Sequence, residues 1–143
     1  MSQSKHQAIV AAVATILEAL SAVPVVEGRD IPLDATTPAQ VNVFLGDSTP
    51  ATTTLTGAPI DWTTQISVQV KARATSTASA EAAAAAVWVD AWALVMADTS
   101  LGGLVAGLDP APVLRDRDEA DTDLHCITWQ FTVMHRTANN VLT

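Results

Sequence analysis

The side chains in this sequence that most readily do chemistry are three histidines and one cysteine. His6, His125 and His135 are scattered along the chain, but His125 directly precedes Cys126. A thiol beside an imidazole suggests a nucleophilic pair. Neighbouring residues on a strand point to opposite faces, however, so these two side chains are not expected to meet. We therefore interpret Cys126 as a small buried residue and His125 as a surface residue, with His6 on a helix face and His135 at a strand end.

A cluster of acidic residues is the second group that could form a site. Its members are Asp116, Asp118, Glu119, Asp121 and Asp123. The cluster lacks the glycine and the terminal bidentate glutamate of a calcium-binding loop, so we interpret it as a solvated turn. Gly102-Gly103 is not followed by the Lys-Ser/Thr of a phosphate-binding loop, and no Ser-His-Asp set is recognisable. We expect no enzyme activity, no bound metal and no cofactor.

Composition and charge narrow the class of protein. The 143 residues are 49% apolar, which predicts one ordered domain with a substantial core. The net charge of −8 argues against a protein that grips nucleic-acid phosphates, although an acidic surface would let DNA slide past without adhering. Charged residues make up only 15% of the chain, so much of the surface must be Thr, Ser, Gln and Ala. The lone cysteine excludes an internal disulfide and fits folding in a reducing cytosol.

The apolar segments predict neither a secretory signal nor a membrane span. The stretch Ala8–Ala14 follows Lys5, but its apolar residues have helical spacing and Glu18 comes soon after them, unlike in a signal peptide. Glu81 and Asp90 interrupt the only long apolar run.

That run, Thr77–Ala97, is the element around which the chain is organised. It is rich in alanine and long enough for a helix that crosses a small domain. One apolar stripe consists of Ala84, Val87, Trp88, Ala91, Trp92 and Val95, and a second consists of Ala82, Ala85, Ala86, Val89, Ala93 and Met96. A helix that is apolar on two sides must be covered by its own sheet and by another surface, such as a second subunit. We expect a subunit interface that contains Val89, Trp92, Met96, Leu101 and Leu104.

The other patterns predict an α+β fold. The segment Trp62–Val70 alternates apolar and polar side chains, as in a sheet with one covered face. Thr75 or Ser76 is the expected N-cap of the long helix. We expect a small mixed or antiparallel sheet with the long helix and an N-terminal helix packed on one face. The expected elements are a helix over Ser4–Leu20, strands over Val23–Val26, Val41–Gly46, Trp62–Val70, Val113–Arg117 and Leu124–Arg136, a long exposed loop or hairpin extension over Asp47–Pro59, and a flexible tail over 138–143.

The order of these elements, together with two short motifs, resembles a known family. The Trp62 strand leads into the alanine-rich helix, then into Ala97-Asp98-Thr99-Ser100-Leu101-Gly102-Gly103-Leu104-Val105, the acidic turn and the closing segment Thr128–Thr137. From Ala8 to Thr137 this pattern resembles the tail-terminator proteins (minor tail protein U-like) of long-tailed phages. The segment Asp47–Pro59 has no fixed counterpart in that pattern.

The resemblance implies a structural virion protein that is made in the host cytoplasm and located at the head–tail interface. Six copies would form a ring on the completed tail tube, end tube polymerisation and offer a surface to the head-completion or connector protein. DNA would pass through the ring without specific binding. If the turn with Asp116, Asp118, Glu119 and Asp121 faces the channel, its charge would keep DNA from adhering.

Two alternatives remain open. One is another neck or head-completion component, or a tail-tube subunit, which would polymerise into open-ended tubes rather than closed rings. The other is a small ligand-binding or enzymatic α+β domain, which would need a concave pocket with convergent polar groups.

Overall fold

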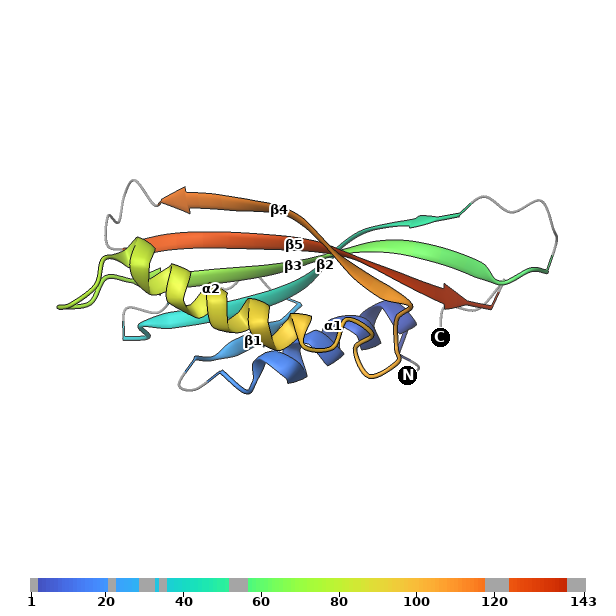
Figure 1. Cartoon of the computed structure of the whole chain (residues 1–143), viewed down its shortest axis with the longest axis horizontal. Helices are drawn as coiled ribbons and strands as arrows, with labels where there is room; N and C mark the ends of the chain where they lie inside the picture. Colours follow the sequence, from blue (N-terminus) through green and yellow to red (C-terminus); the bar gives the residue numbers. More distant parts are fainter. Residues whose placement is uncertain are drawn as a thin grey trace.

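The computed structural model describes residues 3–20, 23–28, 33, 36–51, 57–117 and 124–138. These residues form two helices and five strands (Figure 1). In chain order they are α1 (Lys5–Leu17), β1 (Val25–Glu27), β2 (Ala39–Pro50), β3 (Ile60–Arg73), α2 (Ala80–Met96), β4 (Gly107–Arg117) and β5 (Leu124–Thr137).

The strands form a single mixed sheet in the order β1-β2-β3-β5-β4. The short edge strand β1 runs parallel to β2, whereas all the other neighbouring strands are antiparallel. Both helices lie on the same side of this sheet (Figure 1). The prediction of an α+β fold with two helices on one face of a mixed sheet is therefore confirmed.

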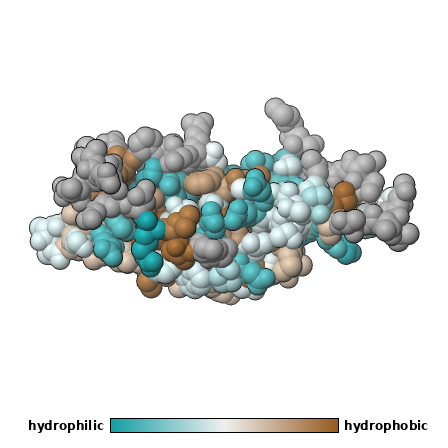
Figure 2. Space-filling model, turned by 90° about the horizontal axis from the view of Figure 1, so that it is seen from above, coloured by the Kyte–Doolittle hydropathy of each residue, from teal (hydrophilic) through white to brown (hydrophobic). Residues whose placement is uncertain are grey.

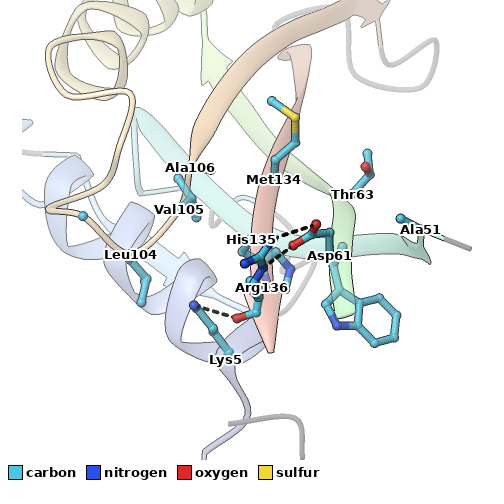
Figure 3. A pocket seen from close by; sticks show the side chains of 12 residues that line it. Lys5, Ala51, Asp61, Thr63, Leu104, Val105, Ala106, Met134, His135 and Arg136 are labelled. Carbon is cyan, nitrogen blue, oxygen red and sulfur yellow. Dashed lines mark hydrogen bonds and ion pairs between the residues drawn. The ribbon is translucent and has the colours of Figure 1, made fainter. Parts of the chain in front are cut away.

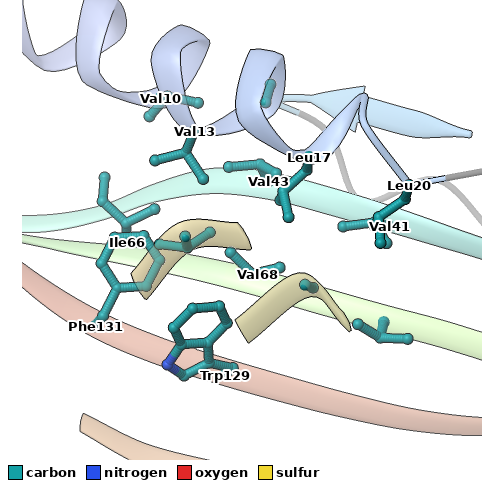
Figure 4. Close-up of a cluster of buried hydrophobic side chains, with 14 of the residues drawn as sticks. Val10, Val13, Leu17, Leu20, Val41, Val43, Ile66, Val68, Trp129 and Phe131 are labelled. Atoms are coloured by element: carbon teal, nitrogen blue, oxygen red, sulfur yellow. The ribbon is translucent and has the colours of Figure 1, made fainter. Parts of the chain in front are cut away.

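The core lies between that face and the two helices, and alternation along β3 and β5 creates it. Ile66, Val68 and Val70 of β3 are fully buried, as are Trp129 and Phe131 of β5. The Trp129 ring lies 4.6 Å from the ring of Trp92 on α2 and 5.1 Å from that of Phe131, as measured between ring centroids. From α1, the side chains of Ile9, Val10, Val13 and Leu17 complete the cluster (Figure 4). Each strand contributes every second residue, as the period of a strand requires.

The other face of the sheet carries amides and hydroxyls, and neither α1 nor α2 packs on it. The Gln40 amide donates to Asn42 Oδ1 at 3.1 Å, and the Asn42 amide donates to Gln69 Oε1 at 3.2 Å. Further along, the Gln65 amide donates to Gln130 Oε1 at 3.1 Å. The bond from Gln40 runs along β2, whereas those from Asn42 and Gln65 cross to the neighbouring strand, and together they satisfy polar side chains on this face of the sheet.

Of the two forms expected for Asp47–Pro59, a loop or a hairpin extension, the structure has the hairpin: the expected start at Asp47 lies within β2, whereas the expected end at Pro59 agrees with the start of β3. Strand β2 continues to Pro50 and β3 begins at Ile60, so this region is the extension of a hairpin that projects beyond the helices (Figure 1). The sequence of this region lacks apolar alternation because neither α1 nor α2 covers this part of the sheet. Gly46 is not the end of a strand but a point of close approach, where a Cβ would lie 3.0 Å from the Gln65 carbonyl oxygen.

Three smaller boundaries also differ from expectation. Strand β4 begins at Gly107 rather than Val113, with a register shift between Pro110 and Val113 that hides its first half from a search for alternation. The first strand is Val25–Glu27. The tail beyond 138 lies outside the described residues.

The N-cap of α2 is Ser79, not Thr75 or Ser76. The Ser79 hydroxyl accepts the Ala82 N–H at 3.2 Å. The Thr75 hydroxyl instead accepts the N–H groups of Thr77 and Ala78, which forms a turn just before the helix.

Replacing Ser79 with Ala should lower the free energy of unfolding by about 1 kcal/mol, because the first turn of α2 loses the acceptor for one N–H. The exposed Ser76 is the matched control, and Ser76→Ala should change the stability by less than about 0.5 kcal/mol. Urea unfolding followed by circular dichroism measures both. Equal losses in the two variants would contradict the assignment of the cap.

Candidate functional site

An apolar cleft between α2 and β4 contains part of the predicted interface. It is lined by Trp88, Val89 and Trp92 of α2 and by Val113 of β4, and its volume is about 320 Å³. Val89 is 59% exposed, which is unusual for a large apolar side chain in the middle of a helix. Two of the predicted residues, Val89 and Trp92, are therefore brought together at this cleft.

The two apolar stripes of α2 have different surroundings. Ala84, Ala91 and Val95 of the first stripe are buried against the sheet. From the second stripe, Ala82, Ala86, Val89 and Ala93 are exposed. The sheet thus covers one side of the helix, and none of the described elements covers the other.

A cation borders the cleft. The guanidinium of Arg115 lies 5.6 Å from the ring centroid of Trp88, within the range of a cation–π interaction. Trp88 and Trp92 meet edge to face, with centroids 6.0 Å apart. These contacts hold the indole rings that form the walls of the cleft.

The other predicted interface residues do not line this cleft. Leu101 is only 5% exposed and belongs to the chain's own core, so it has little surface left for contact with another subunit. Met96 is half-buried at the end of α2, and Leu104 lines a different pocket. Leu101 is buried because it lies in the turn after α2, where its backbone has a φ of 50° and its side chain points inward.

Asp98 builds that turn. Its carboxylate accepts the Ser100 hydroxyl at 2.6 Å, the Ser100 N–H at 3.0 Å and the Gly102 N–H at 2.8 Å. These hydrogen bonds, that of the Ser100 side chain first, lower the pKa of the Asp98 carboxyl. Gly102 and Gly103 both have positive φ, which reverses the chain after the helix.

The predicted acidic turn is only partly described. Asp116 belongs to strand β4, where its backbone pairs with Cys126, so it is not part of a turn. Asp118, Glu119 and Asp121 lie outside the described residues.

His125 and Cys126 do point to opposite faces of β5, but their burial is the reverse of what we expected. His125 is only 8% exposed and shares the core face with Ile127, whereas Cys126 is half-buried on the amide-bearing face. They do not form a nucleophilic pair.

A histidine cluster that the sequence did not reveal joins α1 to the sheet. The rings of His6 and His135 meet edge to face with centroids 4.6 Å apart, and His6 contacts Trp62 at 5.0 Å in the same manner. His135 Nε2 and Thr64 Oγ1 are 2.8 Å apart, and Thr64 Oγ1 and Ser48 Oγ are also 2.8 Å apart. The cluster thus links the start of α1 with three strands.

The cluster borders a pocket of about 510 Å³ whose rim is charged (Figure 3). At the rim, Arg136 forms an ion pair with Asp61 at 2.6 Å, and Lys5 Nζ donates to the Arg136 carbonyl oxygen at 2.9 Å. The hydrogen bond from Arg136 lowers the pKa of Asp61. Both members of the ion pair are largely exposed, so solvent screens it and its contribution to stability is small.

Burial sets the protonation state of the His135 imidazole. Desolvation, followed by the nearby charges of His6 and Lys5, lowers the pKa of His135 to about 4, and desolvation also lowers the pKa of His6. His135 is therefore neutral at pH 7. Its Thr64 neighbour is 0% exposed, so this hydroxyl cannot reach a substrate in the pocket. Thr64 and His135 have the side-chain types of a nucleophile and its general base, but a substrate could not reach the Thr64 hydroxyl.

Neither a metal cluster nor a membrane helix appears in the part of the chain that the structure describes. No group of three His, Cys, Asp or Glu side chains there could hold a metal ion. The described helices are too short or too polar to cross a membrane.

Comparisons with known proteins give likenesses among solved structures alone. No protein-family model and no curated protein matches the chain. Among solved structures, the chain is similar to one from the "Virion of native gene transfer agent (GTA) particle", with 21% sequence identity and a TM-score of 0.49. The match covers 89% of this chain and 93% of that one. A likeness of this strength carries no functional weight.

The His135 site should make stability depend on pH. The pKa of this group is about 4 in the folded chain and 6.5 as its ordinary value, so the unfolded chain takes up the proton first as the pH falls. The contribution, of about 3 kcal/mol, should be fully present above pH 6.5 and lost as the pH falls to 4. Urea unfolding across this range measures it.

The matched variant is His135→Gln, whose amide can still bond to Thr64 but does not titrate. Its free energy of unfolding should change less between pH 6.5 and 4 than that of the wild type. The pKa of Asp61 and that of Asp98 are also lowered, but both proteins contain these carboxyls, so their contribution cancels in the comparison. An identical pH slope in the two proteins would contradict the assignment.

Proposed function

We propose that this chain is a structural component of a phage-like virion, and more narrowly the tail terminator of a long-tailed phage. In this role six copies form a ring on the finished tail tube. The ring ends tube polymerisation and presents a surface to the head-completion or connector protein. It has no catalytic task and no cofactor, and it resides at the head–tail interface of the virion.

The observation that carries the proposal is the uncovered apolar side of α2. Val89 is 59% exposed beside the cleft, and three alanines of the same stripe are also exposed. Contiguous apolar surface of this kind marks a site of protein–protein contact. A subunit whose central helix is apolar on two sides is suited to self-association.

Two further features support the proposal. The chain pattern that resembles tail terminators consists of the β3 strand, α2, the turn at Leu101 and the β5 strand, and these elements form the centre of the fold. In Figure 2 much of the visible surface is pale, the shade of residues with intermediate hydropathy. A weakly charged surface on a chain with a net charge of −8 suits a ring through which DNA passes without binding.

A second candidate function is supported by the pocket of about 510 Å³ beside Lys5, Asp61 and Arg136. Its volume lies within the range of small-molecule sites, and its rim has polar groups of both signs. A ligand-binding α+β domain would gain thermal stability from a bound small molecule. A shift in the unfolding temperature in a screen of charged metabolites, lost in Arg136→Ala, would favour this function over the first.

The decisive test of the first function is electron microscopy of particles produced when this gene is deleted from the genome that encodes it. We expect overlong tubes without heads, because tube growth then lacks its stop. Normal-length tails beside full heads would move the role to head–tail joining. The absence of tubes would make the chain a tube or initiation component, and unchanged virions would contradict a role in assembly.

A further inference from the structure

We propose that the first turn of α1 is an acid-sensitive latch. Proton uptake by His6 and His135 at mildly acidic pH releases this turn from β3 and β5, while the rest of the fold stays closed. The latch consists of residues 4–7, which form the cap and the first turn of the helix. The inference goes beyond the proposed function and does not depend on it, because the latch lies within a single copy of the chain.

Two buried imidazoles form the contact between the latch and the sheet. The side chains of His6 and His135 are 8% and 3% exposed, and their ring centroids lie 4.6 Å apart. The His135 Nε2 atom bonds to the Thr64 hydroxyl, whereas its buried Nδ1 atom has no partner in the part of the chain that the structure describes. An imidazolium carries a proton on both nitrogens, so its Nδ1–H would lack an acceptor here.

The charges on the latch oppose a further positive charge. The Lys5 ammonium is held beside β5 by a bond of 2.9 Å to the Arg136 carbonyl oxygen. The first turn of α1 contains no acidic residue, and the positive end of the helix dipole lies there. Protonation of either imidazole therefore adds a like charge next to Lys5.

No carboxylate among the described residues compensates that charge. Asp61 of β3 is already paired with Arg136, and both side chains are exposed. Asp47 of β2 is exposed, and the Asp98 carboxylate accepts hydrogen bonds within its own turn. Desolvation lowers the pKa of both imidazoles, and the charges of α1 lower that of the β5 imidazole further. The closed contact therefore disfavours a proton that the open form accepts in water.

The rest of α1 is attached by a different kind of contact. Its side chains in the core are aliphatic and do not titrate: Ile9, Val10, Val13, Ala14 and Leu17. In the latch itself, the only buried side chain among the described residues is that of His6. Separation of the first turn therefore leaves the aliphatic contacts of α1 in place, and the opening is local.

Release of the latch changes the pocket of about 510 Å³. Lys5 of the latch lines this pocket together with Trp62 and His135 of the sheet. The Trp62 ring also loses its contact with His6, which is 5.0 Å between centroids in the closed form. Opening thus removes one side of the pocket and exposes the indole ring to water.

The test is amide hydrogen exchange of the full chain by NMR, at pH 7 and pH 4.5 and at several low urea concentrations. Protection factors correct for the effect of pH on the chemical rate of exchange. The probes are the N–H groups of Ala8, which donates to the Ser4 carbonyl at 3.0 Å, and of Ile9 and Val10, which follow it in the helix. All three lose their acceptors when the latch opens.

The expected result has two parts. The pKa of His135 is about 4 in the closed form and 6.5 as its ordinary value, so the open form binds the proton first as the pH falls. Protection of the three probes should therefore fall by about 50-fold from pH 7 to pH 4.5. Their exchange should not depend on urea, because a local opening exposes little surface, whereas exchange at Leu17 and in β3 should rise with urea.

The variants are His6→Phe, which keeps an aromatic ring at the contact, and His135→Gln, which keeps a bond to Thr64. Each should reduce the fall in protection, and the double variant should reduce it to less than about threefold. The matched control is His125→Gln, which also removes a buried histidine of β5 and should keep the fall of the wild type. Circular dichroism at pH 7 checks that each variant is folded.

Three results would overturn the proposal. One is a fall in the wild type of less than about fivefold, since the two imidazoles would then not oppose protonation. Another is exchange of the three probes with the same urea dependence as Leu17, which would make the opening global rather than local. The third is a fall of wild-type size in the double variant, which would assign the effect to other groups.

Discussion

The sheet of this protein is longer than the helices that cover it, and most of its features follow from that mismatch. Strands β3 and β5 each have 14 residues, which corresponds to about 46 Å of extended chain. Helix α2 has 17 residues and spans only about 26 Å. Where α1 and α2 lie, every second strand residue can be apolar. Beyond the helices, polar side chains of the β2–β3 hairpin form hydrogen bonds with one another, as between the hydroxyls of Ser48 and Thr64.

The same mismatch explains the position of the histidine cluster. The start of α1 reaches the sheet where α2 no longer covers it, and there His6 packs on His135 and Trp62 instead of on aliphatic side chains. The buried imidazole of His135 has a hydrogen bond on one nitrogen only among the described residues, because Nδ1 has no partner. Burial lowers the pKa of His135 to about 4, so the imidazole that contacts the start of α1 is neutral at pH 7.

Most of the fold could be predicted from the sequence, because helices and strands repeat their apolar residues every two to four positions. Alternation in β3 and β5 and the alanine-rich helix identify the sheet, its buried face and the covering helix. His125 lies two and four positions before Ile127 and Trp129, so the alternation of β5 itself predicts that His125 is buried. The candidate sites depend on longer distances: Lys5 and Arg136 meet across 131 positions, and no local pattern reports such a pair. Similarly, the inward turn of Leu101 depends on hydrogen bonds to Asp98, which a count of apolar residues cannot detect.

The register shift in β4 has a further consequence. Pro110 lies in the outermost strand at this shift, and Pro112 follows two positions later. Proline has no backbone N–H, so this half of the edge cannot donate the regular ladder of bonds that another strand would need. The sheets of separate molecules are therefore not expected to pair along this half of the edge.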